Sequence, residues 1–273
     1  MQNPKYDQLK QILADIGSVV VAYSGGTDSS LVLKVAHDLL GDRVVALTAV
    51  SASLPAAERD EAERIARQIG VRHVLIHSDE TSDPEYLANT PNRCFFCKTE
   101  TYGKLSEYAN SHGFRTIVDG TNADDTGDFR PGRQAARDYA VRSPLLEAGF
   151  SKAEVRQLAQ ALGLPNWDKP AAACLSSRIP YGTTITLEAL AQVERAEALL
   201  HGLGLRQLRV RHHGALARIE AEPVDFQVLL SQRESIVAAL KSFGYLYVTF
   251  DLAGFRSGSM NDALQRPAGE ARP

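Results

Sequence analysis

The chain has 273 residues, enough for a sizeable core and about two domains. Its 44% hydrophobic and 23% charged residues are typical of a globular protein in water, and its formal net charge of −3 offers no general attraction to a nucleic acid. There is no run of about 18 apolar residues to span a membrane, and the polar start Met1–Lys5 lacks the apolar core of a signal peptide. We therefore expect a cytoplasmic protein with neither a membrane nor a nucleic-acid partner.

The first predicted elements are a buried strand over residues 19–22 and a helix whose apolar positions recur through 31–40. Between them lies Ser-Gly-Gly-Thr-Asp-Ser at 24–29. Adjacent glycines let the backbone approach a ligand, hydroxyls add donors, and a helix start presents unpaired N–H groups, so this turn suits phosphate. Its spacing is neither the Walker pattern nor the Gly-x-Gly-x-x-Gly of dinucleotide folds. The alternative is a capped turn without a ligand.

This hexapeptide resembles the pyrophosphatase loop of the N-type ATP pyrophosphatases. The resemblance implies that ATP is cleaved between its α and β phosphates, giving an adenylated substrate and pyrophosphate, and that Asp28 helps to hold magnesium. The residues then expected to bind ATP are Ala22, Ser24, Gly25, Gly26, Thr27, Asp28, Ser29 and Gly120.

The next segments alternate between strands and helices. We expect strands near 43–50, 71–77 and 116–118, and helices near 55–70 and 98–112. This alternation predicts an α/β fold, a parallel sheet with helices on both faces. The resemblance implies more specifically the adenine nucleotide alpha hydrolase-like form of that fold.

The third of these strands runs into the acidic stretch Asp119–Asp125. Ligands of an open parallel sheet bind at the carboxyl ends of its strands, so this stretch should face the phosphate-binding turn. Two or three carboxylates beside a triphosphate suit a magnesium ion, and Asp124 is the candidate beside Asp28. The alternative is a solvated turn rich in Asp and Asn.

Cys94, Cys97 and Cys174 form the second candidate site. An odd number of cysteines without an export signal argues against a disulfide framework. Cys94 and Cys97 follow a loop and precede the helix expected from residue 98, so both sulfurs can point to one centre. Zinc would need a histidine to complete a closed site, whereas three thiolates suffice for a [4Fe–4S] cluster with one iron free of protein ligands. Three unconnected buried thiols are the alternative.

A second, small α+β domain is expected beyond the Pro- and Ala-rich segment 165–180. Its predicted elements are a helix near 187–203, strands near 208–212 and 215–220, a helix near 224–243 and a strand near 245–250. We therefore assign residues 1–165 to the first domain and 166–261 to the second. Residues 262–273, with two prolines and few apolar side chains, are predicted to be disordered.

Charged residues of this second domain are candidates for substrate binding. Arg209 and Arg211 are two apart on a predicted strand and share a face, and guanidinium groups can hold a phosphate bidentately. The alternative is a solvated strand face. Glu197, with Glu220 or Glu222, can hold a further magnesium ion near the substrate, although exposed glutamate is the commoner outcome.

The segment 170–182, the loop at 24–29, the Arg-Val-Arg at 209–211 and the Gly-Phe-Arg-Ser-Gly at 254–258 resemble the LarE-type sulfur transferases, over nearly the whole chain. The resemblance implies that the carboxylates of a pyridinium dicarboxylate mononucleotide are adenylated and converted to thiocarboxylates for a nickel-pincer nucleotide cofactor. It also implies that Arg256 joins Arg209 and Arg211 at the substrate phosphate, and that the protein is a homo-oligomer, a hexamer built from dimers.

Two routes for the sulfur stay open. One LarE branch gives up the sulfur of a single cysteine at the position of Cys174. The added Cys94 and Cys97 are similar to a three-cysteine branch, in which an iron–sulfur cluster is implied to supply sulfur catalytically. The sequence leaves the ultimate sulfur donor open.

Rival functions are a tRNA thiolase or an ammonia-dependent synthetase of the same superfamily, and a non-catalytic adenine-nucleotide sensor. Neither an RNA-binding appendage nor a glutaminase domain is evident in the sequence. Pyrophosphate release separates the sensor from the enzymes.

Overall fold

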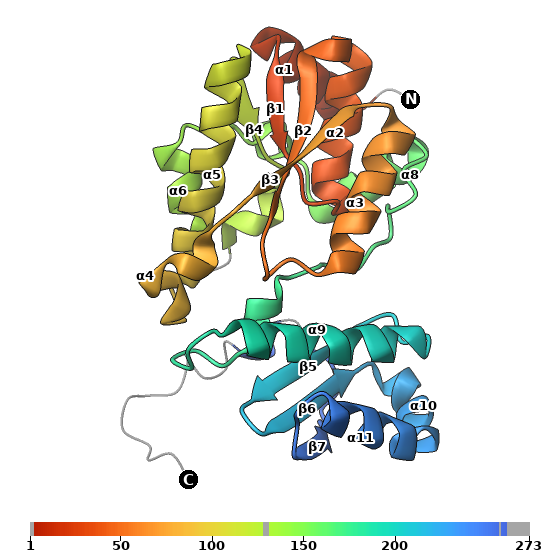
Figure 1. The fold of residues 1–273 in the computed structure, drawn as a ribbon. Coiled ribbons are helices and arrows are strands. Elements are labelled where there is room, and N and C mark those ends of the chain that lie inside the picture. The colour runs from red at the N-terminus through yellow and green to blue at the C-terminus, as the bar shows by residue number, and fades with distance from the viewer. Residues whose placement is uncertain (1–2, 128–130, 257, 261–273) are drawn as a thin grey trace. The chain divides into compact units, whose positions relative to one another are not determined.

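The computed structural model describes residues 3–127, 131–256 and 258–260 (Figure 1). It divides the chain into two compact units, one made of residues up to Tyr86 with Pro91–Ala172, the other of Leu87–Thr90 with the residues from Ala173 onward. The tail predicted over 262–273 lies outside the described residues. Within the part of the chain that the structure describes, no helix is long and apolar enough to cross a membrane.

The first unit is built on a four-stranded parallel sheet of order β3-β2-β1-β4. Its strands are β1 (Val19–Ala22), β2 (Val44–Val50), β3 (Arg72–His77) and β4 (Thr116–Val118). Val19 lies opposite both Val44 and Thr116, so β2, β1 and β4 begin level with one another. Because all strands run the same way, the loops that follow them emerge at one edge of the sheet.

Helices cover both faces of this sheet, as the alternation predicts (Figure 1). The long ones are α1 (Pro4–Ile16), α2 (Thr27–Leu40), α3 (Ala56–Ile69), α5 (Arg93–His112) and α8 (Lys152–Ala161), with the short α4 (Pro84–Leu87), α6 (Gly132–Asp138) and α7 (Pro144–Glu147). Alternate residues of β1 serve the two faces: Val19 and Val21 pack into the core with α1, α2 and α8, whereas Val20 packs with Leu105 of α5. The predicted α/β fold is therefore confirmed.

The second unit holds a three-stranded sheet of order β5-β6-β7. Strands β5 (Leu208–His213) and β6 (Leu216–Ala221) are antiparallel, and β7 (Tyr247–Phe250) runs parallel to β6. Its helices are α9 (Leu187–Gly202), α10 (Phe226–Ser231) and α11 (Arg233–Ser242).

The single helix predicted over 224–243 is wrong, because the segment forms a 3-10 turn, Pro223–Asp225, and then the two helices α10 and α11. The break falls at Gln232, with φ −100° and ψ 12°. Just before it, Ser231 Oγ donates to Val228 O at 3.0 Å. A serine hydroxyl that bonds back to a helix carbonyl competes with the backbone ladder and bends the helix.

Candidate active site

The loop between β1 and α2 has the geometry of an anion site. Gly26 is the N-cap of α2, and among the described residues no side chain caps it, so the first N–H groups of the helix are left for a ligand. Gly25 has φ +72°, and a Cβ there would lie 2.8 Å from Ala62 Cβ of α3. Only glycine fits this position, because the left-handed conformation and the close approach to α3 both exclude a side chain.

The hydroxyl groups of this loop differ in their partners. Ser24 is exposed, and its Oγ lies 3.2 Å from Ser29 Oγ. Ser29 Oγ also donates to Gly26 O at 3.2 Å, which closes the loop on itself. Thr27 Oγ1 donates to Asn166 O at 2.7 Å, so this hydroxyl is engaged by the protein. Ser24 is therefore the loop hydroxyl best placed to meet a phosphate.

Gly120, just beyond β4, packs against the start of α2, as the topology of a parallel sheet predicts. A Cβ on Gly120 would lie 2.6 Å from Ser29 N and 2.9 Å from the carbonyl carbon of Asp28. No side chain can occupy this position without moving one of the two backbones. The glycine therefore brings the acidic stretch after β4 beside the phosphate-binding loop.

Asp28 is a partly buried carboxylate in the first turn of α2. Its Oδ1 accepts from Nδ2 of the fully buried Asn122 at 3.3 Å. Burial raises the pKa of Asp28, and the neighbouring charge of Asp125 raises this pKa further, against the opposing effect of Lys152. A partly buried carboxylate with a second, buried carboxylate near it fits a hard divalent cation.

Asp125, rather than Asp124, is the carboxylate that acts on Asp28. Asp124 is exposed, and its Oδ2 accepts from the N–H of Lys152, the first residue of α8, at 2.9 Å. Asp125 is buried, and its Oδ2 accepts from Asn122 N at 3.1 Å. The geometry thus does not favour the magnesium role expected of Asp124, because its carboxylate serves the start of a helix.

A magnesium ion at this position would depend on ATP for further ligands. Among the described residues, no group of three or more His, Cys, Asp and Glu side chains has a geometry that could hold a metal. Magnesium commonly takes one or two carboxylates and completes its octahedron with phosphate oxygens and water. Asp28 and Asp125 fit that pattern.

Cys94 and Cys97 lie in the first turns of α5, which begins at Arg93. The prediction that the helix starts near residue 98 was wrong, because Phe95 N already donates to Asn92 O at 2.8 Å, within the first turn of the helix. Three residues apart on a helix, the two sulfurs share a face. A helix N-terminus favours thiolates, so the pair fits a metal or cluster.

Cys174 belongs to the second unit and precedes the 3-10 turn Leu175–Arg178. Its side chain is partly buried, and its carbonyl oxygen accepts from Arg178 Nη1 at 3.0 Å and from Ser177 Oγ at 2.8 Å. These bonds fix the backbone that carries the thiol. Convergence of Cys174 with Cys94 and Cys97 stays a prediction.

Arg211 is buried, so the alternative of a solvated strand face is wrong for this residue. Its Nε and Nη2 bond Glu220 Oε2 at 3.0 and 2.7 Å, Nη2 also donates to Ser259 Oγ at 2.8 Å, and Nη1 donates to Ser177 O at 3.1 Å. A guanidinium with this many protein acceptors is held rigidly in place.

Arg209 is a partly buried cation that lies close to other arginines. Burial lowers its pKa to about 10, and repulsion from Arg178 and Arg211 contributes to that lowering. Its guanidinium lies 5.2 Å from the ring centroid of Phe255, and the next residue, Arg256, is exposed. The carboxylates of Glu197 and Glu220 oppose that lowering, and a bound phosphate would act on the pKa in the same direction.

Glu197 is buried and its carboxylate pairs with an arginine, an arrangement that does not favour the expected role of Glu197 as a magnesium ligand. Its Oε1 and Oε2 accept from Arg178 Nε and Nη2 at 2.9 and 2.7 Å, and Val210 N donates to Oε1 at 2.9 Å. Both oxygens are engaged, so a metal would have to displace the arginine. No role was predicted for Arg178 from the sequence, although it lies four residues after Cys174, at the end of Leu-Ser-Ser-Arg.

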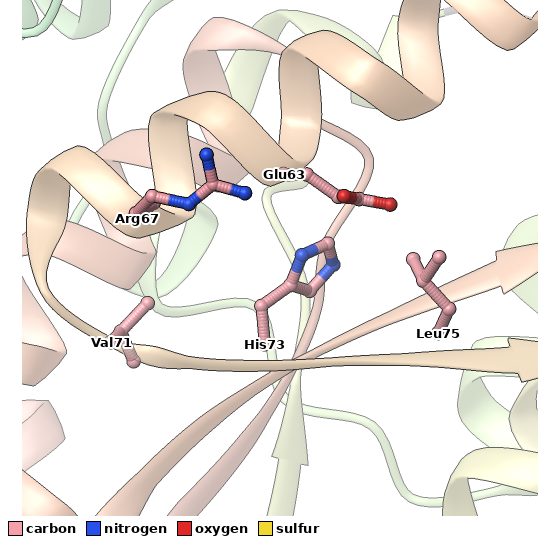
Figure 2. Close-up of a pocket in the computed structure, with 5 residues that line it drawn as sticks. All are labelled: Glu63, Arg67, Val71, His73 and Leu75. Atoms are coloured by element: carbon pink, nitrogen blue, oxygen red, sulfur yellow. The ribbon is translucent and has the colours of Figure 1, made fainter.

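A separate pocket lies between α3 and β3 and is lined by Glu63, Arg67, Val71, His73 and Leu75 (Figure 2). None of these residues was predicted to bind anything. His73 Nε2 lies 2.8 Å from Thr48 Oγ1, which donates to Tyr23 O at 2.7 Å. The pocket is thus connected through two side chains to the residue before the phosphate-binding loop.

Comparison with known proteins places this site in a family. A model of the asparagine synthase family matches residues 9–164, which include the loop after β1 and the acidic stretch after β4. The chain is 43% identical, over 93% of its length, to the pyridinium-3,5-bisthiocarboxylic acid mononucleotide synthase of Lactiplantibacillus plantarum, and the match covers 92% of that protein. The chain belongs to the LarE-type sulfur transferase family.

Two further relatives differ in how much of this LarE-type chain they match. It is 47% identical over 97% of its length to an uncharacterized protein of Synechocystis sp., all of which the match covers. It is 27% identical over 59% of its length to one subunit of the glutamine-hydrolysing GMP synthase of Methanocaldococcus jannaschii, of which 54% is covered. The similarity to LarE therefore extends through both units, whereas the similarity to the synthetase covers a smaller part.

Proposed function

We propose that the chain is an ATP-dependent sulfur transferase that converts the carboxylates of a pyridinium-3,5-dicarboxylate mononucleotide into thiocarboxylates, a step in making a nickel-pincer nucleotide cofactor. The observation that carries the proposal is the 43% identity over nearly the whole chain to a synthase named for that product. The uncapped loop after β1, with Gly25 and Gly120 shaped for close approach, supports the ATP-dependent part.

The first chemical step in this proposal is adenylation. A substrate carboxylate oxygen attacks the α-phosphorus of ATP, the bond to the β-phosphate oxygen breaks, and pyrophosphate leaves. The N–H groups at the start of α2 and the Ser24 hydroxyl stabilise the charge that develops on the leaving group. Asp28 and Asp125 would hold magnesium, which when bound supplies positive charge for the triphosphate.

The second step is sulfur transfer. A sulfur nucleophile attacks the acyl carbon of the mixed anhydride, and AMP leaves with the electrons of the acyl–oxygen bond. Thiolates suit this step because they are strongly nucleophilic near neutral pH. We propose that Cys174, Cys94 and Cys97 provide the sulfur chemistry, and that a bound [4Fe–4S] cluster would supply transferable sulfide.

The second unit provides the cations for the substrate phosphate. Arg209 is partly buried and its guanidinium lies near the ring of Phe255, the residue before Arg256, while Glu220 holds Arg211 rigidly in place. Arg256 joins them in this proposal. We also propose a cytoplasmic homo-oligomer, a hexamer built from dimers, which light scattering of the purified protein tests.

The test is turnover with defined substrates. Protein purified without oxygen is incubated with ATP, magnesium and the dicarboxylate mononucleotide, and AMP, pyrophosphate and the mass of the product are measured. We expect pyrophosphate release that depends on the mononucleotide, and a product in which sulfur replaces carboxylate oxygen. ATP binding without pyrophosphate release would support the sensor instead, and release that depends on tRNA would support a tRNA thiolase.

A further inference from the structure

We propose that Asn166 is a positioning residue for the pyrophosphatase loop, which it holds in the shape that receives the phosphates of ATP. Asn166 lies in the irregular segment after α8, about 140 residues from the loop in sequence, and is 2% exposed. Its Nδ2 donates to Gly25 O and to Ser30 Oγ, both at 2.9 Å. The inference rests on the proposed ATP-dependent function of this loop.

The bond to Gly25 O fixes the orientation of one peptide plane. A trans peptide is planar, and its N–H points opposite to its C=O. With the Gly25 carbonyl held by Asn166, the N–H of Gly26 points away from Asn166. Within the described parts of the chain, that N–H has one long bond, to Ser24 Oγ at 3.4 Å, and it belongs to the N-cap of α2. Asn166 therefore orients a backbone donor at the position where an anion binds.

The backbone of Asn166 contacts the same loop. Thr27 Oγ1 donates to Asn166 O at 2.7 Å. Gly25 and Ser30 are thus held by the side chain of Asn166, and Thr27, between them, is held by its carbonyl oxygen. Three contacts from one residue to consecutive parts of a loop leave that loop little freedom, which lowers the entropy lost when ATP binds.

The unsatisfied oxygen of the same amide supports a positioning role. Asn166 Oδ1 is buried and has no hydrogen-bond donor among the described residues. A buried amide acceptor without a partner carries a free-energy cost. Turning the amide over would place Oδ1 against Gly25 O, which cannot donate. The orientation that holds the loop is therefore kept although it leaves Oδ1 unpaired.

The segment that carries Asn166 has a second attachment, which provides a control. Lys169 Nζ forms ion pairs with Glu58 and Glu61 of α3, the first at 2.8 Å, and Arg156 Nη2 donates to Lys169 O at 3.2 Å. Replacing Lys169 with methionine loosens the segment but leaves the amide contacts of Asn166 in place. The two attachments can therefore be weakened separately.

The experiment compares Asn166→Asp and Asn166→Ala with Lys169→Met in the full-length protein. Asn166→Asp keeps the shape but replaces the donor Nδ2 by an acceptor oxygen, which faces the Gly25 carbonyl oxygen. We expect it to raise the KM for ATP and the inhibition constant of inorganic pyrophosphate by about tenfold each, because the bond that holds Gly25 O is replaced by repulsion between two acceptors. Lys169→Met should raise neither by more than about twofold, although its melting temperature falls.

Three outcomes distinguish the possibilities. An unchanged KM for ATP in folded Asn166→Asp overturns the positioning role. Equal increases in Asn166→Asp and Lys169→Met also overturn it, because the effect would then belong to the segment as a whole. If Asn166→Asp does not fold, Asn166→Ala decides by the same two constants. Absence of ATP binding by the unmodified protein would instead contradict the proposed function itself.

Discussion

Asp28 combines a cost in stability with a role in function. Its pKa is raised above the ordinary value of 3.8, first by burial and then by Asp125, so the ionised form is less favourable in the folded chain than in the unfolded chain. The folded protein therefore loses stability as the pH rises from 3.8 through the raised pKa, and the loss persists at neutral pH. A bound cation would remove this loss of stability, because it favours the ionised carboxylate.

We predict that Asp28→Asn raises the melting temperature of the ligand-free protein at pH 7 and lowers pyrophosphate release at least about tenfold, as loss of a metal ligand would. The stability gain should disappear below pH 3.8, where the carboxyl is neutral in both states. Thermal unfolding at several pH values and a pyrophosphate assay check the two parts. Wild-type pyrophosphate release from the variant would refute the site.

Arg209 and Arg211 were predicted as equivalent, but their surroundings differ. We predict that Arg209→Met weakens binding of the phosphate-bearing substrate by roughly 1.5–3 kcal/mol and costs less stability than Arg211→Met, because burial and the neighbouring arginines lower the pKa of Arg209 in the fold. Arg211→Met should lower stability by up to about 3–5 kcal/mol, because Glu220 loses its closest cation. Calorimetric titration and denaturant unfolding distinguish the two, while ATP affinity changes little in either.

At this scale the roles predicted for single residues stay predictions, whereas their places in the fold are now known. The sequence placed Ser24–Ser29 between a strand and a helix and Gly120 just after a strand, as the structure has them, because glycines and hydroxyls at a helix start form a compact pattern. That Asp125 is buried and Asp124 exposed depends on how a short 3-10 turn directs adjacent side chains, which composition does not reveal. Asn166 is joined to its loop only by tertiary folding, so no local pattern indicates it.

The start of helix α8 is determined by a local sequence motif. Ser151 and Glu154 form a capping box, with Glu154 N donating to Ser151 Oγ at 3.4 Å and Ser151 N donating to Glu154 Oε2 at 2.8 Å. A hydrogen bond from Lys5, followed by those from Ser151, lowers the pKa of Glu154 to about 2. Its stabilising effect is therefore complete above the ordinary value of 4.5 and is lost as the pH falls toward 2.

We predict that Ser151→Ala lowers the free energy of unfolding by about 1 kcal/mol at pH 7. The effect should be smaller near pH 2, where Glu154 is partly protonated and its half of the box is weakened. Ser242→Ala is the matched control, because that exposed hydroxyl donates only to Ala239 O within its own helix. Denaturant unfolding at both pH values gives the comparison, and equal losses in the two variants would contradict the capping role.

Element boundaries were predictable where a start or stop residue marks them and not elsewhere. Gly70 and Gly113 both end their helices in the left-handed conformation, as expected of glycine after a last turn. The early start of α5 has a backbone bond from Phe95 N to Asn92 O, and the break at Gln232 follows a hydroxyl bond within α10. Both are interactions that side-chain periodicity does not encode.

In the whole molecule, the candidate site residues lie in both units. The ATP loop and Cys94 with Cys97 belong to the first, and Cys174 with the arginines belongs to the second. The fold of each unit followed from strand and helix patterns. The joint use of three cysteines cannot follow from patterns, because it depends on thiols far apart in the chain. It requires a direct chemical test.

We predict that Cys94, Cys97 and Cys174 bind one [4Fe–4S] cluster and that each single Cys→Ala change loses the cluster and multiple-turnover sulfur transfer. Adenylation should persist in all three variants, because the pyrophosphatase loop contains no cysteine. Iron and sulfide analysis of protein purified without oxygen measures the cluster, and pyrophosphate release measures adenylation. A Ser24→Ala variant provides the reverse pattern, with iron retained and adenylation weakened.

The sacrificial route makes a different demand on the same three residues. If Cys174 alone gives up its sulfur, Cys94→Ala and Cys97→Ala remain active, and each protein molecule turns over once. The Cβ–Sγ bond of Cys174 then breaks, and the sulfur leaves as part of the thiocarboxylate product. Cys174 becomes dehydroalanine, and the protein loses the mass of H₂S. Mass spectrometry of the protein after turnover detects that change. Dehydroalanine at Cys174 in active, iron-free protein would refute the cluster, whereas intact Cys174 after many turnovers of iron-loaded protein would refute the sacrifice.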